Sequence, residues 1–276
     1  MKLTVLVENT SCSAVEAAHG LSLLIETADH RILFDAGPDS GLLLRNAAAL
    51  GVDLAAVDLA FLSHGHYDHA GGLMGFLGIN SRAELYLQRS ALQPHYATES
   101  VGLRYIGIDP ALPEKYAARL HLTGPQERIS ENLLCFANIS SADFLSGSNL
   151  SLLEPDGEGG YAPDAFYHEQ NLLIQENGKL ILIAGCAHRG IINILRSAKM
   201  ITGRAPDAVY AGFHLTNPGK GIDEPENFVR SVGEELKKWP CRFYTGHCTG
   251  KGPYGILKEI LGERLFYLGG GMTFEE

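Results

Sequence analysis

The stretch LAFLSHGHYDHAGGL, residues 59–73, contains three histidines and an aspartate within six positions. His64, His66, Asp68 and His69 form the pattern His-x-His-x-Asp-His. Imidazole nitrogens suit zinc, iron and similar ions, and a carboxylate adds the negative charge that favours a second divalent cation. Because the whole chain has 11 histidines, chance is a poor explanation for three of them in so short a stretch. The pattern therefore predicts a metal-binding loop.

Four ligands on one loop do not complete two metal sites, so other loops have to contribute. Three histidines each follow a strand-like apolar run and a glycine, in LILIAGCAHRG, AVYAGFHLTNP and RFYTGHCTGKG: these are His188, His214 and His247. In open α/β sheets, ligands bind in the loops at strand ends. A single histidine near a core is usually structural, but three at equivalent strand ends favour ligation. We expect His188 and His247 to be ligands, with His214 and Cys186 as further candidates.

The elements that position the first loop are readable from apolar runs and turn residues. A buried strand over Asp58–Ser63 ends at the histidine loop, and a helix from Gly72 to about Leu77 follows it. The other elements expected in this half are strands over Leu3–Glu8, Leu21–Thr27, Arg31–Gly37 and Ala83–Gln88, and a helix over Gly41–Gly51. The strands on either side of residues 28–30 should form a hairpin.

The second half begins with a strong hairpin signal. In NLLIQENGKLILIAG, residues 171–185, the pair Asn177-Gly178 separates two apolar runs, which is typical of a two-residue β-turn. Helices are then expected around 190–201, 226–239 and 254–261, alternating with the strands DAVYAG, RFYTG and LFYLGG. The chain is therefore predicted to be a mixed α/β protein with two halves of similar layout.

Residues from about 89 to 160 break this regularity, being irregular and rich in Pro, Gly, Ser and Tyr. We interpret them as an insertion in a single domain of residues 1–276. Insertions on an α/β scaffold commonly carry substrate contacts. This segment is therefore expected to shape the substrate site.

Bulk composition narrows the functional classes. The net charge of −10 argues against a nucleic-acid partner, and without an apolar run of about 18 residues no membrane partner is expected. The beginning of the sequence lacks the features of a signal peptide, and five cysteines are too sparse for a disulfide framework. We therefore expect a cytoplasmic protein acting on a small-molecule substrate.

The sequence resembles the metallo-β-lactamase superfamily over nearly its whole length. SHGHYDH is similar to its signature loop, and ILFDAG is similar to its upstream aspartate motif, with Asp35 at the aspartate position. The segments HGLSLLIET, SHGHYDHAGGL, GCAHRGI, GFHL and GHCTG further resemble one branch. That branch is named for the 7,8-dihydropterin-6-yl-methyl-4-(β-D-ribofuranosyl)aminobenzene-5'-phosphate synthases.

The resemblance implies a four-layer αβ/βα sandwich, with two mixed sheets, helices outside and a two-metal site at one edge. By this resemblance His64 and His66 bind one metal, and Asp68 and His69 bind the other. His247 matches the late histidine ligand of the superfamily. One or two divalent metals per chain are expected, zinc first, with manganese or iron as alternatives.

The sequence departs from the superfamily pattern around the second hairpin. The usual pattern has a histidine before the hairpin and a bridging aspartate after it, whereas here DAFYHEQ precedes the hairpin and Cys186 follows it. His168 is one candidate for the early histidine. His188 is the preferred one, because GCAH matches the branch. Cys186 is either a soft ligand or a small core residue.

Two further residues have open interpretations. Asp35 is either a turn residue after a strand or, as the resemblance implies, a carboxylate that orients the histidine loop by hydrogen bonds. His19, in AHGLS, lies near the site entrance by the same resemblance and is either structural or substrate-facing.

This chemistry predicts a metal-dependent hydrolase that uses a metal-bound hydroxide on a small phosphorylated or cyclic ester-type metabolite. Asp68 is the expected catalytic residue, holding the nucleophile and taking its proton. One alternative is a synthase joining a pterin diphosphate to an aminobenzene ribosyl phosphate, as the branch name implies. The others are an iron-dependent redox enzyme and a non-catalytic metal-binding module. The chain has neither a Gly-x-Ser-x-Gly elbow nor a Walker-type phosphate loop.

Overall fold

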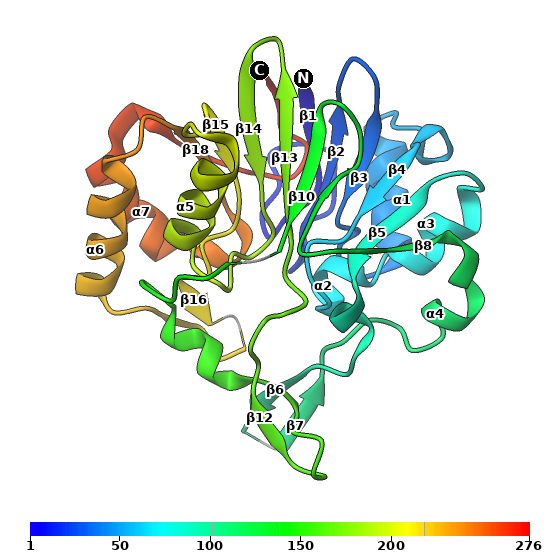
Figure 1. The fold of residues 1–276 in the computed structure, drawn as a ribbon, viewed down its shortest axis with the longest axis horizontal. Helices are drawn as coiled ribbons and strands as arrows, with labels where there is room; N and C mark the ends of the chain where they lie inside the picture. The colour runs from blue at the N-terminus through cyan, green and yellow to red at the C-terminus, as the bar shows by residue number, and fades with distance from the viewer. Residues whose placement is uncertain (101, 138, 218) are drawn as a thin grey trace.

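The chain folds into two seven-stranded mixed sheets with helices on their outer faces (Figure 1). The computed structural model describes residues 1–100, 102–137, 139–217 and 219–276. One apolar cluster contains residues of both sheets, and two further clusters join each sheet to its own helices. The order of layers is therefore helix, sheet, sheet, helix, which confirms the predicted four-layer sandwich.

The first sheet has the strand order β20-β1-β2-β3-β4-β5-β8. Its strands are β20 (Thr273–Glu275), β1 (Lys2–Val7), β2 (Ser22–Glu26), β3 (Arg31–Phe34), β4 (Leu59–Phe61), β5 (Glu84–Gln88) and β8 (Leu120–Thr123). Strands β2 and β3 form the predicted antiparallel hairpin, and β3, β4, β5 and β8 are parallel. Its outer face packs against α1 (Ser40–Ala49) and α3 (Leu73–Ile79).

The second sheet has the order β19-β18-β15-β14-β13-β10-β9. Its strands are β19 (Leu265–Tyr267), β18 (Arg242–Thr245), β15 (Ala208–Tyr210), β14 (Lys179–Ile183), β13 (Asn171–Glu176), β10 (Leu133–Phe136) and β9 (Gln126–Arg128). Asn177 and Gly178 both have positive φ, 51° and 75°, so the predicted β13–β14 hairpin is confirmed. The outer face of this second sheet packs against α5 (Ile191–Thr202), α6 (Glu226–Lys237) and α7 (Lys251–Leu261).

Strands in both sheets are buried on two faces, which explains their nearly continuous apolar sequences. In β3, Ile32 and Phe34 belong to the cluster between the sheets, whereas Leu33 belongs to the cluster under the helices. This alternation follows the two-residue period of a strand. It leaves the strand ends as the places where polar side chains can gather.

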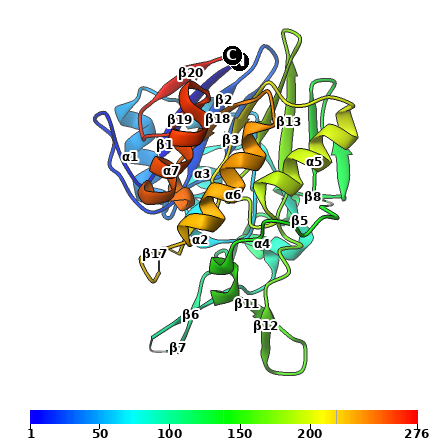
Figure 2. The ribbon, with the colours of Figure 1, turned by 90° about the vertical axis from the view of Figure 1, so that its left-hand side faces the viewer.

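The segment expected as an insertion, residues 89–160, takes part in three sheets. It supplies β8 to the first sheet, and β9 and β10 to the second. Strands β6 (Tyr96–Glu99), β7 (Gly102–Tyr105) and β11 (Leu152–Pro155) join β12 (Tyr161–Pro163) in a separate four-stranded sheet. This added sheet projects from one end of the sandwich (Figure 2).

The remaining short elements lie in connections. They are the helices α2 (Tyr67–Ala70) and α4 (Leu112–Lys115), and the paired strands β16 (Thr216–Asn217) and β17 (Ile222–Asp223). Of the helices within the described residues, none is both long enough and apolar enough to cross a membrane.

Candidate metal centre

Asp35 fixes the histidine loop at both of its ends. This fully buried carboxylate accepts hydrogen bonds from the backbone N–H and the hydroxyl of Ser63, each at 2.7 Å. Its Oδ2 also lies 2.7 Å from Nδ1 of His69, which must donate to it. Strand β3 ends one residue before Asp35, and β4 ends shortly before Ser63. The parallel pairing of the two strands thus brings the carboxylate to the loop.

His64, His66 and His188 form the first group of candidate ligands. Each ring is buried, and its Nε2 has no hydrogen-bond partner among the described residues. One nitrogen or more from each ring lies within 4.8 Å of the others. Because a buried polar atom without a partner is costly, three such atoms on rings that lie this close together fit a bound cation.

The hydrogen bonds of two of these rings fix the tautomer that a metal requires. Ser63 donates its hydroxyl proton to Asp35, so Nδ1 of His64, at 2.8 Å from that hydroxyl, is the donor. Nδ1 of His188 faces the amide oxygen of Asn149 at 3.0 Å and donates to it. In each ring the Nε2 lone pair is therefore free. Burial, followed by repulsion from neighbouring histidines, holds the pKa of both rings well below its usual value.

Asp68, His69 and His247 form the second group. Nε2 of His69 lies 3.1 Å from Nε2 of His247, which lies 3.3 Å from Oδ2 of Asp68. Nδ1 of His247 donates to Oδ1 of Asn9 at 2.8 Å, and Nδ1 of His69 donates to Asp35. Because each ring uses its Nδ1–H as a donor, the two Nε2 atoms are left facing each other, an arrangement that a cation between them would stabilise.

The electrostatics of the second group also favour positive charge. Burial lowers the pKa of His69, but Asp35 and Asp68 outweigh that effect and raise it. Burial raises the pKa of Asp68, yet His69, His19 and His247 together hold it well below its usual value. Asp68 is therefore an ionised carboxylate in a buried site.

Cys186 lies between the two groups. Its Sγ is 3.2 Å from Nε2 of His69, and it can share a metal with His64 and His69, or with His188 and His214. Burial raises the pKa of the Cys186 thiol well above its usual value, but a metal ion deprotonates a thiol that coordinates it. The structure thus places a sulfur within reach of both groups.

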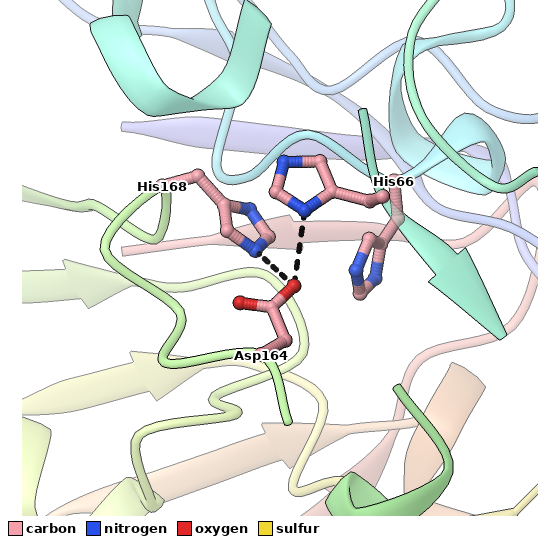
Figure 3. Close-up of side chains that lie close together, drawn as sticks. His66, Asp164 and His168 are labelled. Carbon is pink, nitrogen blue, oxygen red and sulfur yellow. Dashed lines mark hydrogen bonds and ion pairs between the residues drawn. The ribbon is translucent and has the colours of Figure 1, made fainter. Parts of the chain in front are cut away.

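His168, the alternative early histidine, lies outside the His64–His66–His188 group but forms a further cluster with His95, Asp164 and His66, in which the possible ligand atoms are within 4.8 Å of one another. Its Nδ1 accepts the backbone N–H of Gly65 at 2.9 Å, and its Nε2 lies 3.1 Å from Oδ2 of Asp164. Figure 3 shows His168 and Asp164 directed toward each other, with His66 beside them. Asp164 also lies 3.0 Å from Nδ1 of His95. Sequence reasoning missed His95 and Asp164, and neither stands in a motif that would have revealed it.

The other two histidines named from the sequence face a cavity beside the metal groups. His19 is partly exposed and its Nε2 lies 3.1 Å from Oδ2 of Asp68. His214 is buried with its ring 4.1 Å from that of His188, and neither of its nitrogens has a partner within the described parts of the chain. Its φ of 47° is unusual for a residue other than glycine.

The cavity has an empty volume of about 610 Å³, including its open mouth. Its base is lined by members of both candidate metal groups. Its walls include residues of the added sheet and of the turn that directly precedes β11. These residues are Thr98, Glu99, Arg104, Ser148, Ser151 and Leu152. Both candidate metal groups and the added sheet therefore face one cavity.

A buried acid next to the first group gives a pH-dependent prediction. Glu169 accepts the backbone N–H groups of His188 and Arg189, at 2.6 and 2.9 Å, and burial raises its pKa from 4.5 to about 7. Between these values the unfolded chain ionises while the folded chain keeps the proton. Glu169 should therefore contribute a fall of about 3 kcal/mol to the free energy of unfolding of the metal-free protein as pH rises from 4.5 to 7. The buried histidines, whose pKa is lowered, contribute a rise over the same range.

Urea denaturation across that pH range measures this slope for the wild type and for Glu169→Gln. The glutamine variant cannot ionise, so the difference between its free energy of unfolding and that of the wild type should grow by about 3 kcal/mol in favour of the variant as pH rises from 4.5 to 7. The same pH dependence in both proteins would contradict the role of Glu169.

Comparisons with known proteins agree with this architecture. The sequence model of the metallo-β-lactamase superfamily matches residues 16–131. A 7,8-dihydropterin-6-methyl-4-(beta-D-ribofuranosyl)-aminobenzene-5'-phosphate synthase of Methanocaldococcus jannaschii is 29% identical over 245 residues, covering 84% of this chain and 81% of that protein. An uncharacterized protein of the same organism is 30% identical over 253 residues, covering 90% of each chain.

Solved structures show the same fold. The crystal structure of Tm1679, a metal-dependent hydrolase of the β-lactamase superfamily, superposes with a TM-score of 0.81 at 27% identity, covering 100% of this chain and 99% of that one. Zn²⁺-bound PqqB from Methylobacterium extorquens has a TM-score of 0.59 at 13% identity and full coverage of both chains, a likeness of fold alone.

Proposed function

Since the chain belongs to the metallo-β-lactamase superfamily, we propose that it is a hydrolase whose divalent metals bind the two side-chain groups described above. The observation that carries the proposal joins two facts about His64, His66 and His188: each has a buried Nε2 without a partner among the described residues, and the three rings have nitrogens within 4.8 Å of one another. These atoms fit a metal better than any other ligand, because neutral imidazole lone pairs are what such ions bind.

In this proposal the first metal is held by His64, His66 and His188. The second is held by Asp68, His69 and His247, with the thiolate of Cys186 within reach. Bound divalent metals supply Lewis acidity and lower the pKa of a coordinated water to about 7. The residues of the chain supply the orientation of that water and the handling of its proton.

Asp68 is the proposed catalytic residue. It is ionised, lies at the base of the cavity, and has Oδ2 directed at the second group. An ionised carboxylate so placed orients an attacking water and accepts its proton. His19 donates to the same oxygen at 3.1 Å, which helps to keep the carboxylate in place.

The proposed substrate is a small phosphorylated or cyclic ester-type metabolite. The cavity opens to solvent, and the hydroxyl-bearing residues Thr98, Ser148 and Ser151 are among those that line it. The guanidinium of Arg104 also lines the cavity, where it forms an ion pair with Glu99. These groups suit an oxygen-rich anionic substrate.

The proposal is tested by measuring metal content and turnover together. The purified protein should contain one or two equivalents of divalent metal, and a panel of phosphodiesters, lactones and thioesters should include a substrate that it hydrolyses. Chelation should abolish turnover and metal addition should restore it. Absence of tightly bound metal together with absence of metal-stimulated turnover would reject the proposal.

A second candidate function is the synthase reaction named for the relative that is 29% identical over most of both chains. It is tested by incubating the metal-loaded protein with a pterin diphosphate and an aminobenzene ribosyl phosphate. Formation of the condensation product would favour this candidate, and its absence alongside ester hydrolysis would favour the first.

The proposed sulfur ligand leads to a spectroscopic prediction. Loading the protein with Co²⁺ should give a thiolate-to-metal absorption band, because Cys186 Sγ lies 3.2 Å from the His69 nitrogen that faces the second group. Cys186→Ser should lose this band and bind soft metals less tightly.

Cys241→Ser is the matched control, since Cys241 is buried and bonded to the Pro206 carbonyl, in the cluster under the helices. It should keep the band. Loss of the band in Cys248→Ser, with retention in Cys186→Ser, would instead identify Cys248 as the ligand.

A further inference from the structure

A buried cluster of three residues outside the two metal groups connects the added sheet to the histidine loop. Oδ2 of Asp164 lies 3.0 Å from Nδ1 of His95 and 3.1 Å from Nε2 of His168, and all three side chains are almost fully buried. Oδ1 of Asp164 accepts the backbone N–H of Phe166 at 2.6 Å. Both oxygens of the Asp164 carboxylate therefore have hydrogen-bond partners, which fix its orientation.

Two of these residues border strands of the added sheet. Strands β6 and β12 flank β11 on its two sides, and Tyr96 of β6 and Pro163 of β12 both pair with Leu153. His95 directly precedes β6 and Asp164 directly follows β12. The folding of the added sheet thus accompanies the meeting of two residues that are 69 positions apart in the sequence.

His168 carries this link to the metal loop. Its Nε2 donates to Asp164, which leaves the Nδ1 lone pair free to accept the backbone N–H of Gly65 at 2.9 Å. Gly65 lies between His64 and His66 and packs so closely on Ala91 that a Cβ there would come 2.7 Å from the Ala91 carbonyl oxygen. Its peptide therefore has little freedom once His168 holds it.

A backbone connection runs beside this link. The N–H of Ile106 donates to the carbonyl of His95 at 2.8 Å, and the carbonyl of Ile106 accepts the N–H of Tyr67 at 2.7 Å. Residue 67 begins α2, which carries Asp68 and His69. Two hydrogen-bonded routes thus join the added sheet to the loop that carries four candidate ligands.

We propose that His168, which is held by Asp164 and His95, is a positioning residue. Through its hydrogen bond to Gly65 it fixes the positions of the ligands His64 and His66 relative to the wall of the cavity. The inference rests on the proposed metal binding. The added sheet supplies Thr98, Glu99 and Arg104 to that wall. The cluster therefore fixes the distance between the metal loop and the residues that face the substrate.

A role for His168 as a direct ligand fits the structure less well. Both of its ring nitrogens already have partners, whereas Nε2 of His188 has none among the described residues. Turning the ring toward a metal would leave the Gly65 N–H and the Asp164 carboxylate without their partner inside the protein. Such a loss is costly for buried groups.

The experiment compares His168→Phe and His168→Gln by Zn²⁺ titration against a chromophoric chelator. Phenylalanine fills the space but makes neither hydrogen bond, whereas the glutamine amide can accept from Gly65 and donate to Asp164. His121→Phe is the matched control, because His121 pairs with Glu127 at 2.6 Å on β8 at the protein surface. If the phenylalanine variant does not fold, Asp164→Asn takes its place.

We expect His168→Phe to bind Zn²⁺ about 10–100-fold more weakly at one site, with the same total number of sites. Saturating Zn²⁺ should restore kcat, His168→Gln should recover most of the affinity, and His121→Phe should match the wild type. Unchanged affinity in His168→Phe, or permanent loss of one Zn²⁺ per chain, would overturn the positioning role. Absence of Zn²⁺ binding by the wild type would instead reject the proposed function.

Discussion

Replacing Asp68 by asparagine is expected to lower the turnover number by about 10²–10⁴-fold, the range for loss of a positioned proton acceptor. The variant keeps the size of the side chain and removes its charge. In the structure this carboxylate is buried and ionised, and Oδ2 lies 3.1 Å from His19 and 3.3 Å from His247. An amide there neither accepts a proton nor balances the charge of a metal. Steady-state kinetics at matched metal content measure the effect.

Asp39→Asn is the matched control for this substitution. Asp39 caps the N-terminus of α1 by accepting the N–H of Leu42, and asparagine is an equally good cap. The control should therefore keep its turnover number and its stability. Full activity of Asp68→Asn with normal metal content would remove Asp68 from the proposed chemistry.

The parts of the fold and of the site that could be predicted from the sequence depend on residues that are close together in the chain. Apolar runs bounded by turn residues located the strands β1–β5, β13, β14, β15, β18 and β19, and Asn177-Gly178 located a hairpin because both residues adopt positive φ. The histidine loop was recognisable because its candidate ligands are neighbours in the sequence. His188 and His247 were recognisable because each follows a strand, and parallel strands end at the same edge of a sheet.

The parts that escaped prediction depend on long-range pairing. His95 and Asp164 border strands β6 and β12, which flank β11 in a sheet whose pairing no local pattern reveals. Likewise β20 pairs with β1 across almost the whole sequence. The choice between His168 and His188 also depended on tertiary structure, since only the hydrogen bonds show which ring has a nitrogen to spare.

The largest loss of stability is expected for Asp35→Asn. Breaking a buried charged network of this kind costs about 3–5 kcal/mol in the free energy of unfolding. Asparagine tolerates the left-handed conformation of this position, where φ is 56°, so the backbone is not the cause. The amide, however, presents an NH₂ group where the carboxylate accepts three hydrogen bonds, from two groups of Ser63 and from His69. Urea denaturation of the metal-free protein measures the loss.

Asp58→Asn provides the comparison. The carboxylate of Asp58 also accepts a backbone N–H, that of Arg31, and also contacts a histidine ring, that of His30, but it lies near the surface. Its loss should stay below about 1 kcal/mol. Asp35→Asn should also weaken metal binding, since His69 loses the acceptor that directs its Nε2 at the second group. Equal losses in the two variants, with unchanged metal affinity, would show that Asp35 is a turn residue and that other contacts hold the histidine loop.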